Sequence, residues 1–344
     1  MVALGPTVGR ATTGAFVDPI DQPASVSALA EKSQIFALAR AGGRLVAAGV
    51  RGHILVSDDA GKTWRQSAVP VSVDLVGLSF PTAQQGWAVG HGGVVLHTSD
   101  GGLNWQRQLA GLDSSRQAEV HYNASALSPL AASALAQEKQ LMQVPRGQPF
   151  LDVYFENVTE GFAVGTFNRI FRTVDAGKRW TPWMDRVDNP DQLHFSAIRG
   201  RGDRVFLTGE RGQVWSLDRT SQRFVSVATP YTGTLFGLQI GAPQQLLAFG
   251  MRGSLYQSDD DGHRWNKLQA GGSGAGITAA AELPDGRVVL VDQAGEIRVR
   301  GAAPASLVKI IPGPRRMPLF AVVAVNASRI VMGGALGLMT FDLP

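Results

Sequence analysis

The 344-residue sequence contains no cysteine, which excludes disulfide bonds, thiol catalysis and thiolate metal sites. Lysine is scarce, because 26 of the 32 basic residues are arginine and only 6 are lysine. No run of basic residues and no ladder of aromatic residues marks a nucleic-acid-binding protein. No apolar stretch approaches the ~18 residues of a membrane span, and the longest, Leu319 to Val325, is the length of a strand. The sequence therefore argues against nucleic-acid binding and against direct insertion into a membrane.

Glycine, by contrast, is abundant, with 41 residues, and it belongs to a repeated block. The block consists of an apolar strand, a second strand that in most copies ends in glycine, a tight turn, a third strand and, in four copies, a turn that ends in tryptophan. The glycine recurs at steps of 41, 75, 44 and 41 residues, at Gly49, Gly90, Gly165, Gly209 and Gly250. Asp292 and Gly333 take its place further on. A unit of about 41 residues with three or four strands is typical of a propeller blade.

The spacing predicts an all-β fold, a seven-bladed β-propeller, in a single domain over residues 33–344. The seven units fall at 33–68, 73–110, 148–186, 193–228, 233–270, 275–311 and 317–344. The last unit has room for three strands only. We expect part of the N-terminal segment 1–32, within residues 14–30, to add its outer strand, because an unclosed ring leaves exposed edges. A six-bladed ring with a separate cap is the alternative.

The 75-residue step contains an insertion at about residues 111–147, between the second and third units. Its middle part, Ala124 to Met142, is rich in helix formers and has no glycine, which predicts at least one helix. We expect Pro129 to stand in the first turn of a helix or to interrupt the segment.

A second motif, Ser/Thr-x-Asp-x-Gly-x-x-Trp, follows the third strand in four units. Its aspartates and tryptophans are Asp59 and Trp64, Asp100 and Trp105, Asp175 and Trp180, and Asp260 and Trp265. The hydroxyl and carboxylate can satisfy backbone donors of the turn, and the tryptophan can fill the space between blades. Because each aspartate serves one blade, a structural role is favoured over catalysis or calcium binding.

These motifs resemble the Asp-box (BNR) repeat. The stretches 80–93 (FPTAQQGWAVGHGG) and 161–165 (GFAVG) are similar to the photosystem II stability/assembly factor family of seven-bladed propellers. The resemblance covers about residues 33–344 and implies a non-catalytic, extracytoplasmic assembly factor that binds subunits of a membrane-protein complex. The arginine-rich, Ala/Gly-rich composition is typical of a GC-rich bacterium. We therefore expect a member from a non-photosynthetic bacterium, where some members of the family accompany large membrane exporters.

The compartment follows only from the resemblance, which implies a periplasmic protein whose signal peptide has been removed. Met1 is not followed by the basic region and apolar segment of a signal peptide, so a cytoplasmic location stays open.

The tight turn after the second strand carries a basic residue in five units. These partner-binding candidates are Arg51, His91, Arg169, Arg211 and Arg252. We interpret the turn with Arg169 as one residue longer than the others. In a propeller these turns share a face with the blade-to-blade connections, so we expect the side chains to gather near one mouth of the central channel, with the insertion rising over the same face. The resemblance adds an arginine patch, to which these positions are matched.

Guanidinium groups suit the capture of an acidic or carboxylate-bearing segment, because they bind carboxylates in a bidentate manner and stay charged. The plainer alternative is that arginine is common in exposed turns and pairs there with neighbours such as Glu210. A small-anion sensor that uses the same arginines is a further possibility.

Asp-box propellers include sialidases, so a carbohydrate-active glycosidase is the alternative function. Such an enzyme needs an arginine triad, a general acid and a nucleophile pair, for which Tyr231 and Glu210 are the candidates. No Arg-Ile-Pro opening of the sialidase kind precedes the first unit, so we expect no enzymatic activity. The six histidines show no zinc-ligand spacing, and no metal or other cofactor is expected.

Overall fold

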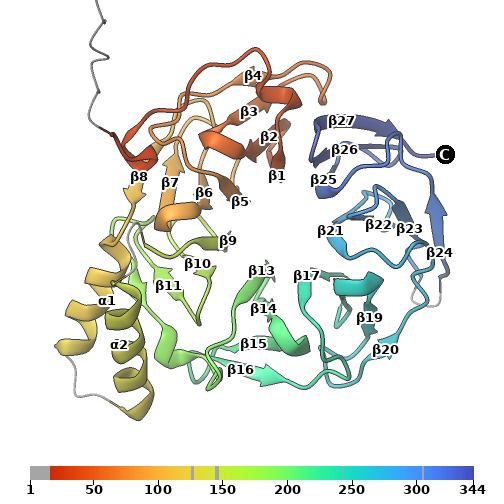
Figure 1. Ribbon diagram of the computed structural model, residues 1–344. Coiled ribbons are helices and arrows are strands. Elements are labelled where there is room, and N and C mark those ends of the chain that lie inside the picture. Colours follow the sequence, from red (N-terminus) through yellow and green to blue (C-terminus); the bar gives the residue numbers. More distant parts are fainter. Residues whose placement is uncertain (1–15, 125–127, 144–146, 242, 304–305) are drawn as a thin grey trace, which may run out of the picture.

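The computed structural model describes residues 16–124, 128–143, 147–241, 243–303 and 306–344. Seven antiparallel sheets stand in a ring around a central channel (Figure 1). In each sheet the strands follow one another outward from the channel in chain order. The predicted seven-bladed β-propeller is therefore confirmed, and the six-bladed alternative is wrong.

The first three blades contain β1 (Ile35–Ala41), β2 (Arg44–Gly49), β3 (Ile54–Ser57) and β4 (Arg65–Gln66); β5 (Leu75–Ser79), β6 (Gly86–Gly90), β7 (Val94–Thr98) and β8 (Gln106–Leu109); and β9 (Phe150–Phe155), β10 (Gly161–Gly165), β11 (Ile170–Thr173) and β12 (Thr181–Pro182). The next three contain β13 (Phe195–Arg201), β14 (Arg204–Gly209), β15 (Val214–Asp218) and β16 (Arg223–Val227); β17 (Leu235–Ile240), β18 (Leu246–Gly250), β19 (Leu255–Ser258) and β20 (Asn266–Lys267); and β21 (Ile277–Glu282), β22 (Val288–Asp292), β23 (Ile297–Arg300) and β24 (Val308–Ile311). The seventh contains β25 (Leu319–Ala324), β26 (Arg329–Gly334) and β27 (Gly337–Asp342).

The recurring glycine ends the second strand because the carbonyl oxygen of the residue just before the neighbouring innermost strand crowds it. A Cβ atom on Gly49 would lie 2.1 Å from the carbonyl oxygen of Gln34, and one on Gly90 would lie 2.0 Å from that of Asp74. Both glycines have extended backbone, with φ of −157° and −173°. The close approach accompanies a register shift at the first residue of the innermost strand, which recurs in all seven sheets.

The hydrophobic core lies between neighbouring blades. Trp87 of β6 is fully buried and stacks on Phe155 of β9 in the next blade, with ring centroids 3.5 Å apart. Its indole N–H donates to Gln108 Oε1 at 3.2 Å, so the one polar atom of this side chain is satisfied. Blade-to-blade burial of this kind holds the ring together.

The insertion forms two helices, α1 (Asp113–Asn123) and α2 (Pro129–Leu141), at the outer side of the third blade (Figure 1). The predicted helix is α2. Pro129 stands at its first position, and Ser128 Oγ accepts the N–H of Ala131 as an N-cap. Helix α1 lies ahead of the stretch predicted to be helical, and residues 125–127 of that stretch lie outside the described residues. No helix of the described residues is long and apolar enough to cross a membrane.

The seventh blade has three strands in the described part of the chain, and residues 16–30 do not form the predicted fourth one. They run along the first two blades instead. The Ala24 N–H donates to the Val69 carbonyl at 3.0 Å, and the Ser72 N–H donates to the Pro19 carbonyl at 2.8 Å. Residues 14 and 15 lie outside the described residues.

The ring closes by face-to-face packing, because β1 lies against β25 and β26. The rings of Phe36 and Phe320 are 5.6 Å apart across this junction. The segment ahead of β1 contains two short 3-10 turns, η1 (Pro19–Asp21) and η2 (Ala30–Lys32). Of these, η2 reaches the last blade, where the backbone of Glu31 lies against Gly337. In the described part of the chain, the first and seventh blades share no sheet.

Candidate binding surface on the turn face

Four of the tight turns after the second strand contain a 3-10 turn. They are η3 (Val50–Gly52), η4 (His91–Gly93), η6 (Glu210–Gly212) and η7 (Met251–Gly253). The start of each innermost strand lies at the same end of the blade, since Ile35 pairs with Gly49. We call this end of the propeller the turn face. The Asp boxes follow the other end of the third strand and lie on the opposite face.

The Asp-box carboxylates are engaged by their own turns. Asp59 Oδ1 accepts the Lys62 and Thr63 N–H groups at 3.1 and 2.9 Å and the Ser57 hydroxyl at 2.8 Å. The Thr63 hydroxyl and N–H, together with Ser57, lower the pKa of Asp59 to about 2. The same arrangement recurs at Asp100, Asp175 and Asp260.

The box tryptophans fill the spaces beside these turns. Trp105 and Trp180 are buried, while Trp64 and Trp265 are half-buried. Among the described residues no cluster of three or more His, Asp or Glu side chains is placed to hold a metal ion. These features favour the structural interpretation of the boxes.

Three of the candidate arginines occupy one and the same backbone position. Arg51, Arg211 and Arg252 are the second residues of their turns and have φ of 55°, 54° and 58°. All three are exposed. A left-handed backbone costs a residue other than glycine about 1 kcal/mol or more, so this position is costly for arginine in each of the three blades. Within the described residues, neither Arg51 nor Arg252 forms an ion pair, while Arg211 Nη1 lies 2.7 Å from Asp191 Oδ2.

Arg169 does not belong to this set, and its placement on the binding surface was wrong. The third-blade turn has the same length as the others, because the Gly165 N–H donates to the Arg169 carbonyl just as the Gly209 N–H donates to the Gln213 carbonyl. Phe167, with φ of 55°, therefore occupies the position of Arg211. The sequence prediction aligned Arg169 with Arg211 because both are arginines. The hydrogen bond that closes each turn shows that this alignment was wrong by two residues.

Arg169 instead anchors the insertion. Its side chain is fully buried, with Nε 3.1 Å from Glu138 Oε1 of α2. Its Nη2 donates to Ser114 Oγ of α1 at 2.6 Å, and the guanidinium lies over the rings of Phe150 and Phe171. Burial lowers the pKa of Arg169, and Glu138 opposes that shift. This arginine holds both helices on the third blade.

His91 is exposed and precedes the left-handed position, which Gly92 occupies with φ of 68°. Its Nδ1 lies 4.0 Å from Asp74 Oδ2, and Asp74 Oδ1 accepts the Arg51 N–H at 2.9 Å. One carboxylate therefore connects the turns of the first two blades.

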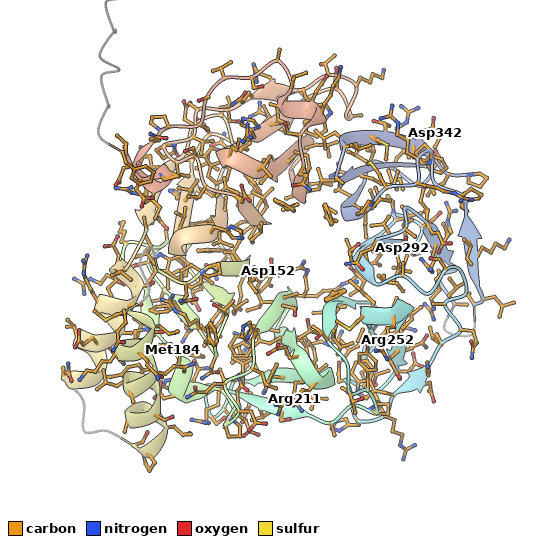
Figure 2. All side chains as sticks on the ribbon, viewed as in Figure 1. Asp152, Met184, Arg211, Arg252, Asp292 and Asp342 are labelled. Atoms are coloured by element: carbon orange, nitrogen blue, oxygen red, sulfur yellow. The ribbon has the colours of Figure 1, made fainter. Side chains whose placement is uncertain are left out.

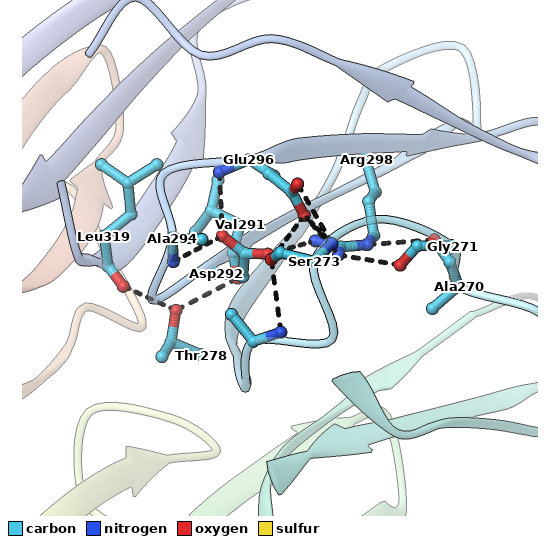
Figure 3. Close-up of polar contacts among 11 residues, drawn as sticks. Ala270, Gly271, Ser273, Thr278, Val291, Asp292, Ala294, Glu296, Arg298 and Leu319 are labelled. Carbon is cyan, nitrogen blue, oxygen red and sulfur yellow. Dashed lines mark hydrogen bonds and ion pairs between the residues drawn. The ribbon is translucent and has the colours of Figure 1, made fainter. Parts of the chain in front are cut away.

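The sixth blade has Ala294 at this position of the turn, and its buried Arg298, on β23, contacts Asp292 (Figure 3). Asp292 replaces the strand-end glycine, and its Oδ1 accepts the N–H groups of Ala294 and Glu296. Its Oδ2 lies 2.7 Å from Arg298 Nη1, and both side chains are fully buried. The Asp292–Arg298 pair stabilises this turn from its buried side, and Arg298 contributes no exposed cation to the turn face.

The central channel is a cavity of about 300 Å³ lined by the innermost strands of all seven blades. None of the five candidate residues lines it. Figure 2 shows Arg211 and Arg252 out over their blades, while Asp152 lies at the channel. Inside the wall, Asp152 pairs with Arg199 of the next blade. The expectation that the arginines gather at the channel mouth was therefore wrong.

A continuous surface does cross the third to fifth blades on the turn face. The Phe167 and His194 rings are 4.5 Å apart, and His194 Nδ1 lies 3.2 Å from Glu210 Oε2 in the turn of Arg211. Further on, Tyr231 packs against Gly212, and its hydroxyl donates to the Met251 carbonyl at 2.9 Å. We call this the blade 3–5 surface. Its members are Phe167, His194, Arg211, Tyr231, Met251 and Arg252.

This surface has the composition of a protein interface. Phe167 and Met251 are exposed by 38% and 41%, which is high for side chains of this size. Aromatic residues, methionine and arginine are enriched at such interfaces. Helix α2 borders the surface, because Gln137 donates to the Phe167 carbonyl at 2.9 Å. Sequence reasoning missed Phe167, which an alignment on the strand-end glycine would have found.

The residues proposed for a glycosidase are not brought together. The Tyr231 hydroxyl is bound to the Met251 carbonyl, and Glu210 accepts the His194 N–H at 2.9 Å. Tyr231 and Glu210 share no hydrogen bond in the described structure.

The fold and its boxes define the class, a seven-bladed propeller of Asp-box (BNR) repeats. The chain belongs to the family described as "Photosynthesis system II assembly factor YCF48", whose profile matches residues 56–127 and 131–297. It is 24% identical over 242 residues to the photosystem II assembly protein Ycf48 of Synechococcus sp. (strain JA-2-3B'a(2-13)), covering 58% of this chain and 72% of that one. It is 22% identical over 280 residues to the chloroplastic photosystem II stability/assembly factor HCF136 of Arabidopsis thaliana, covering 69% and 67%.

Solved structures of the family share the fold. A structure described as "YCF48 bound to D1 peptide" matches with a TM-score of 0.66 and 15% identity, over 91% of this chain and 94% of that one. YCF48 from Cyanidioschyzon merolae matches with a TM-score of 0.67 and 16% identity, over 94% and 98%. The predicted family is therefore confirmed, and its named members are assembly factors.

Proposed function

We propose that this protein is a non-catalytic scaffold or assembly factor for a membrane-protein complex. It binds an acidic or carboxylate-bearing segment of one subunit on the blade 3–5 surface, with Arg51 and His91 at the edge of the same face. Membership of an assembly-factor family supports this role, and one solved relative is described as bound to a peptide. The descriptions of the relatives above name no exporter as a binding partner, so we assign no exporter as the partner.

The observation that carries the proposal is the exposed arginine at the same left-handed position in three blades. Arg252 is available to a partner carboxylate without first breaking an ion pair of the described structure. Arg211 is paired with Asp191, but both side chains are more than 60% exposed, and such a pair is worth about 1 kcal/mol or less. A partner carboxylate in a drier interface can therefore replace Asp191.

The test is affinity purification of the tagged protein from native membranes. Arg211→Glu combined with Arg252→Glu should remove the co-purifying membrane subunit, because each lost charge-assisted hydrogen bond costs about 1.5–3 kcal/mol. The control combines Arg179→Glu with Arg264→Glu, two exposed arginines of the Asp-box turns on the opposite face. It changes the net charge equally and should leave recovery intact. Equal recovery with both double variants would rule out this surface.

We also propose a periplasmic location, which follows from the role in assembling a membrane complex outside the cytoplasm. Fractionation of the native cells tests it, and recovery of the protein with cytoplasmic markers would contradict it.

A further inference from the structure

Within the described residues, the outer strand of the seventh blade has no strand paired on its outward side. In each of the other six blades a fourth strand pairs with the third, whereas β27 is the last strand of its sheet. The Leu343 N–H donates to the Ser328 carbonyl at 2.6 Å, in register with the β26–β27 ladder. In an antiparallel ladder, paired and unpaired backbone groups alternate. The N–H and C=O groups of Leu338, Thr340 and Asp342 therefore point away from β26, into the place of a fourth strand.

A cavity of about 430 Å³ runs along this edge. Its apolar lining comes from Trp64 of the first blade and from Leu336, Leu338 and Met339 of the seventh. Leu336 is 55% exposed, and Trp64 is half-buried. Leu338 and Trp64 pack against the same buried cluster around Ile35, while Met339 packs on the side of the sixth blade. The cavity thus reaches both faces of the open edge, as the site of an added strand must.

The rim of this cavity is positively charged. Lys32, Lys62 and Arg315 line it, all three are exposed, and none forms an ion pair within the described residues. One carboxylate, that of Glu31, also lines it. Asp342 at the end of the edge is neutralised by Arg329, whose Nε lies 2.6 Å from Asp342 Oδ1. The edge therefore has a surplus of positive charge.

We propose that β27 binds an extended acidic segment of a partner protein, which joins the seventh blade as its fourth strand. Main-chain hydrogen bonds to the outward groups of β27 supply affinity, and alternate side chains supply specificity. Apolar side chains of the segment contact Trp64 and Leu338, and its carboxylates meet the three rim cations. Residues 1–15 of this chain contain no Asp or Glu and carry one arginine, so they do not match the charge of the rim. This site is separate from the blade 3–5 surface, and the two proposals stand or fall independently.

The probe is a fluorescein-labelled peptide of alternating glutamate and valine, and the control is the same peptide with lysine for glutamate. Fluorescence anisotropy with the full chain should show binding of the glutamate peptide at least about tenfold tighter than that of the lysine peptide, and the difference should shrink at high salt. Amide hydrogen exchange of Leu338 and Thr340 should slow when the glutamate peptide is bound.

Two pairs of variants locate the site. Thr340→Pro removes an outward N–H, and a proline is tolerated at such a position of an edge strand. Its matched control, Thr340→Ala, loses the same hydroxyl bond to Gly61 but keeps the N–H. The proline variant should bind about tenfold more weakly than the alanine variant. Lys62→Glu combined with Arg315→Glu should weaken binding similarly without touching the strand, and Arg211→Glu should leave it unchanged.

Three results would overturn the proposal. The first is that the two Thr340 variants bind the glutamate peptide with equal affinity and that the variant with Lys62→Glu and Arg315→Glu binds it as tightly as the unchanged protein does. Another is slow exchange of the Leu338 and Thr340 amides in the free monomer, which would mean that this chain already covers its own edge. The last is a concentration-dependent dimer that excludes the peptide, which would make a second copy the occupant.

Discussion

Replacing the buried Arg169 by methionine tests whether one ion pair holds the insertion on the third blade. Methionine keeps the contacts with Phe150 and Phe171 but leaves the carboxylate of Glu138 unpaired, and that side chain is only 2% exposed. Among the described residues, Glu138 Oε2 has no hydrogen-bond partner. Breaking a buried pair from one side costs about 3–5 kcal/mol, and we expect a loss of this size in the free energy of unfolding.

The companion variant, Arg169→Met with Glu138→Leu, removes both charges and should recover most of that loss, because no buried charge then remains unpaired. Denaturant titration followed by tryptophan fluorescence measures each member of the cycle. Amide exchange in α2 should rise sharply in the single variant only. The same cycle on the exposed pair of Arg211 and Asp191 serves as the control, with a coupling of about 1 kcal/mol or less. Additive effects of the Arg169 and Glu138 changes would refute the reasoning.

Two further changes test the repeat itself. The lowered pKa of Asp59 stabilises the fold above about pH 4, and this contribution is lost as the pH falls toward 2. Asp59→Asn should therefore flatten the fall in unfolding free energy between pH 4 and 2 in urea titrations, and an unchanged slope would contradict the role of the box. Gly90→Ala places a Cβ 2.0 Å from the Asp74 carbonyl oxygen and should cost about 2 kcal/mol or more in thermal melts. Gly43→Ala, in open space, is its control and should change the melting temperature little.

The blade count could be predicted because one backbone constraint repeats. A carbonyl oxygen would lie 2.0 to 2.3 Å from a Cβ at each strand-end glycine, at Gly49, Gly90, Gly165, Gly209 and Gly250. Because this contact recurs in each of these blades, glycine recurs at a regular spacing in the sequence, whatever surrounds the blade. Ring closure has no repeated sequence signal of this kind, because it depends on the packing of β1 against β25, which occurs once in the molecule. The position of the N-terminal segment could not be predicted for that reason.

The binding residues were harder to predict, because the exposed turns differ in side chain while sharing a backbone. Arg169 matched the pattern by residue type, yet it stands where Gln213 stands in the next blade and points inward to α2. Phe167 breaks the pattern by type but has the backbone of Arg211. An alignment on the hydrogen bond that closes each turn separates the two cases, and an alignment on arginine cannot.

The insertion and the open edge of β27 affect binding and stability in different ways. The insertion is held by a buried charge on the third blade, so α2 has a fixed position beside Phe167 and can add to the blade 3–5 surface without a large ordering cost on binding. The open edge lies beside the β1–β25 junction, where Thr340 donates to the Gly61 carbonyl at 3.2 Å. A strand bound there would pack on both sides of the junction. Occupation of the edge should therefore raise the stability of the whole ring, by an amount that grows with the logarithm of partner concentration, and a thermal melt of the protein with the glutamate peptide would measure it.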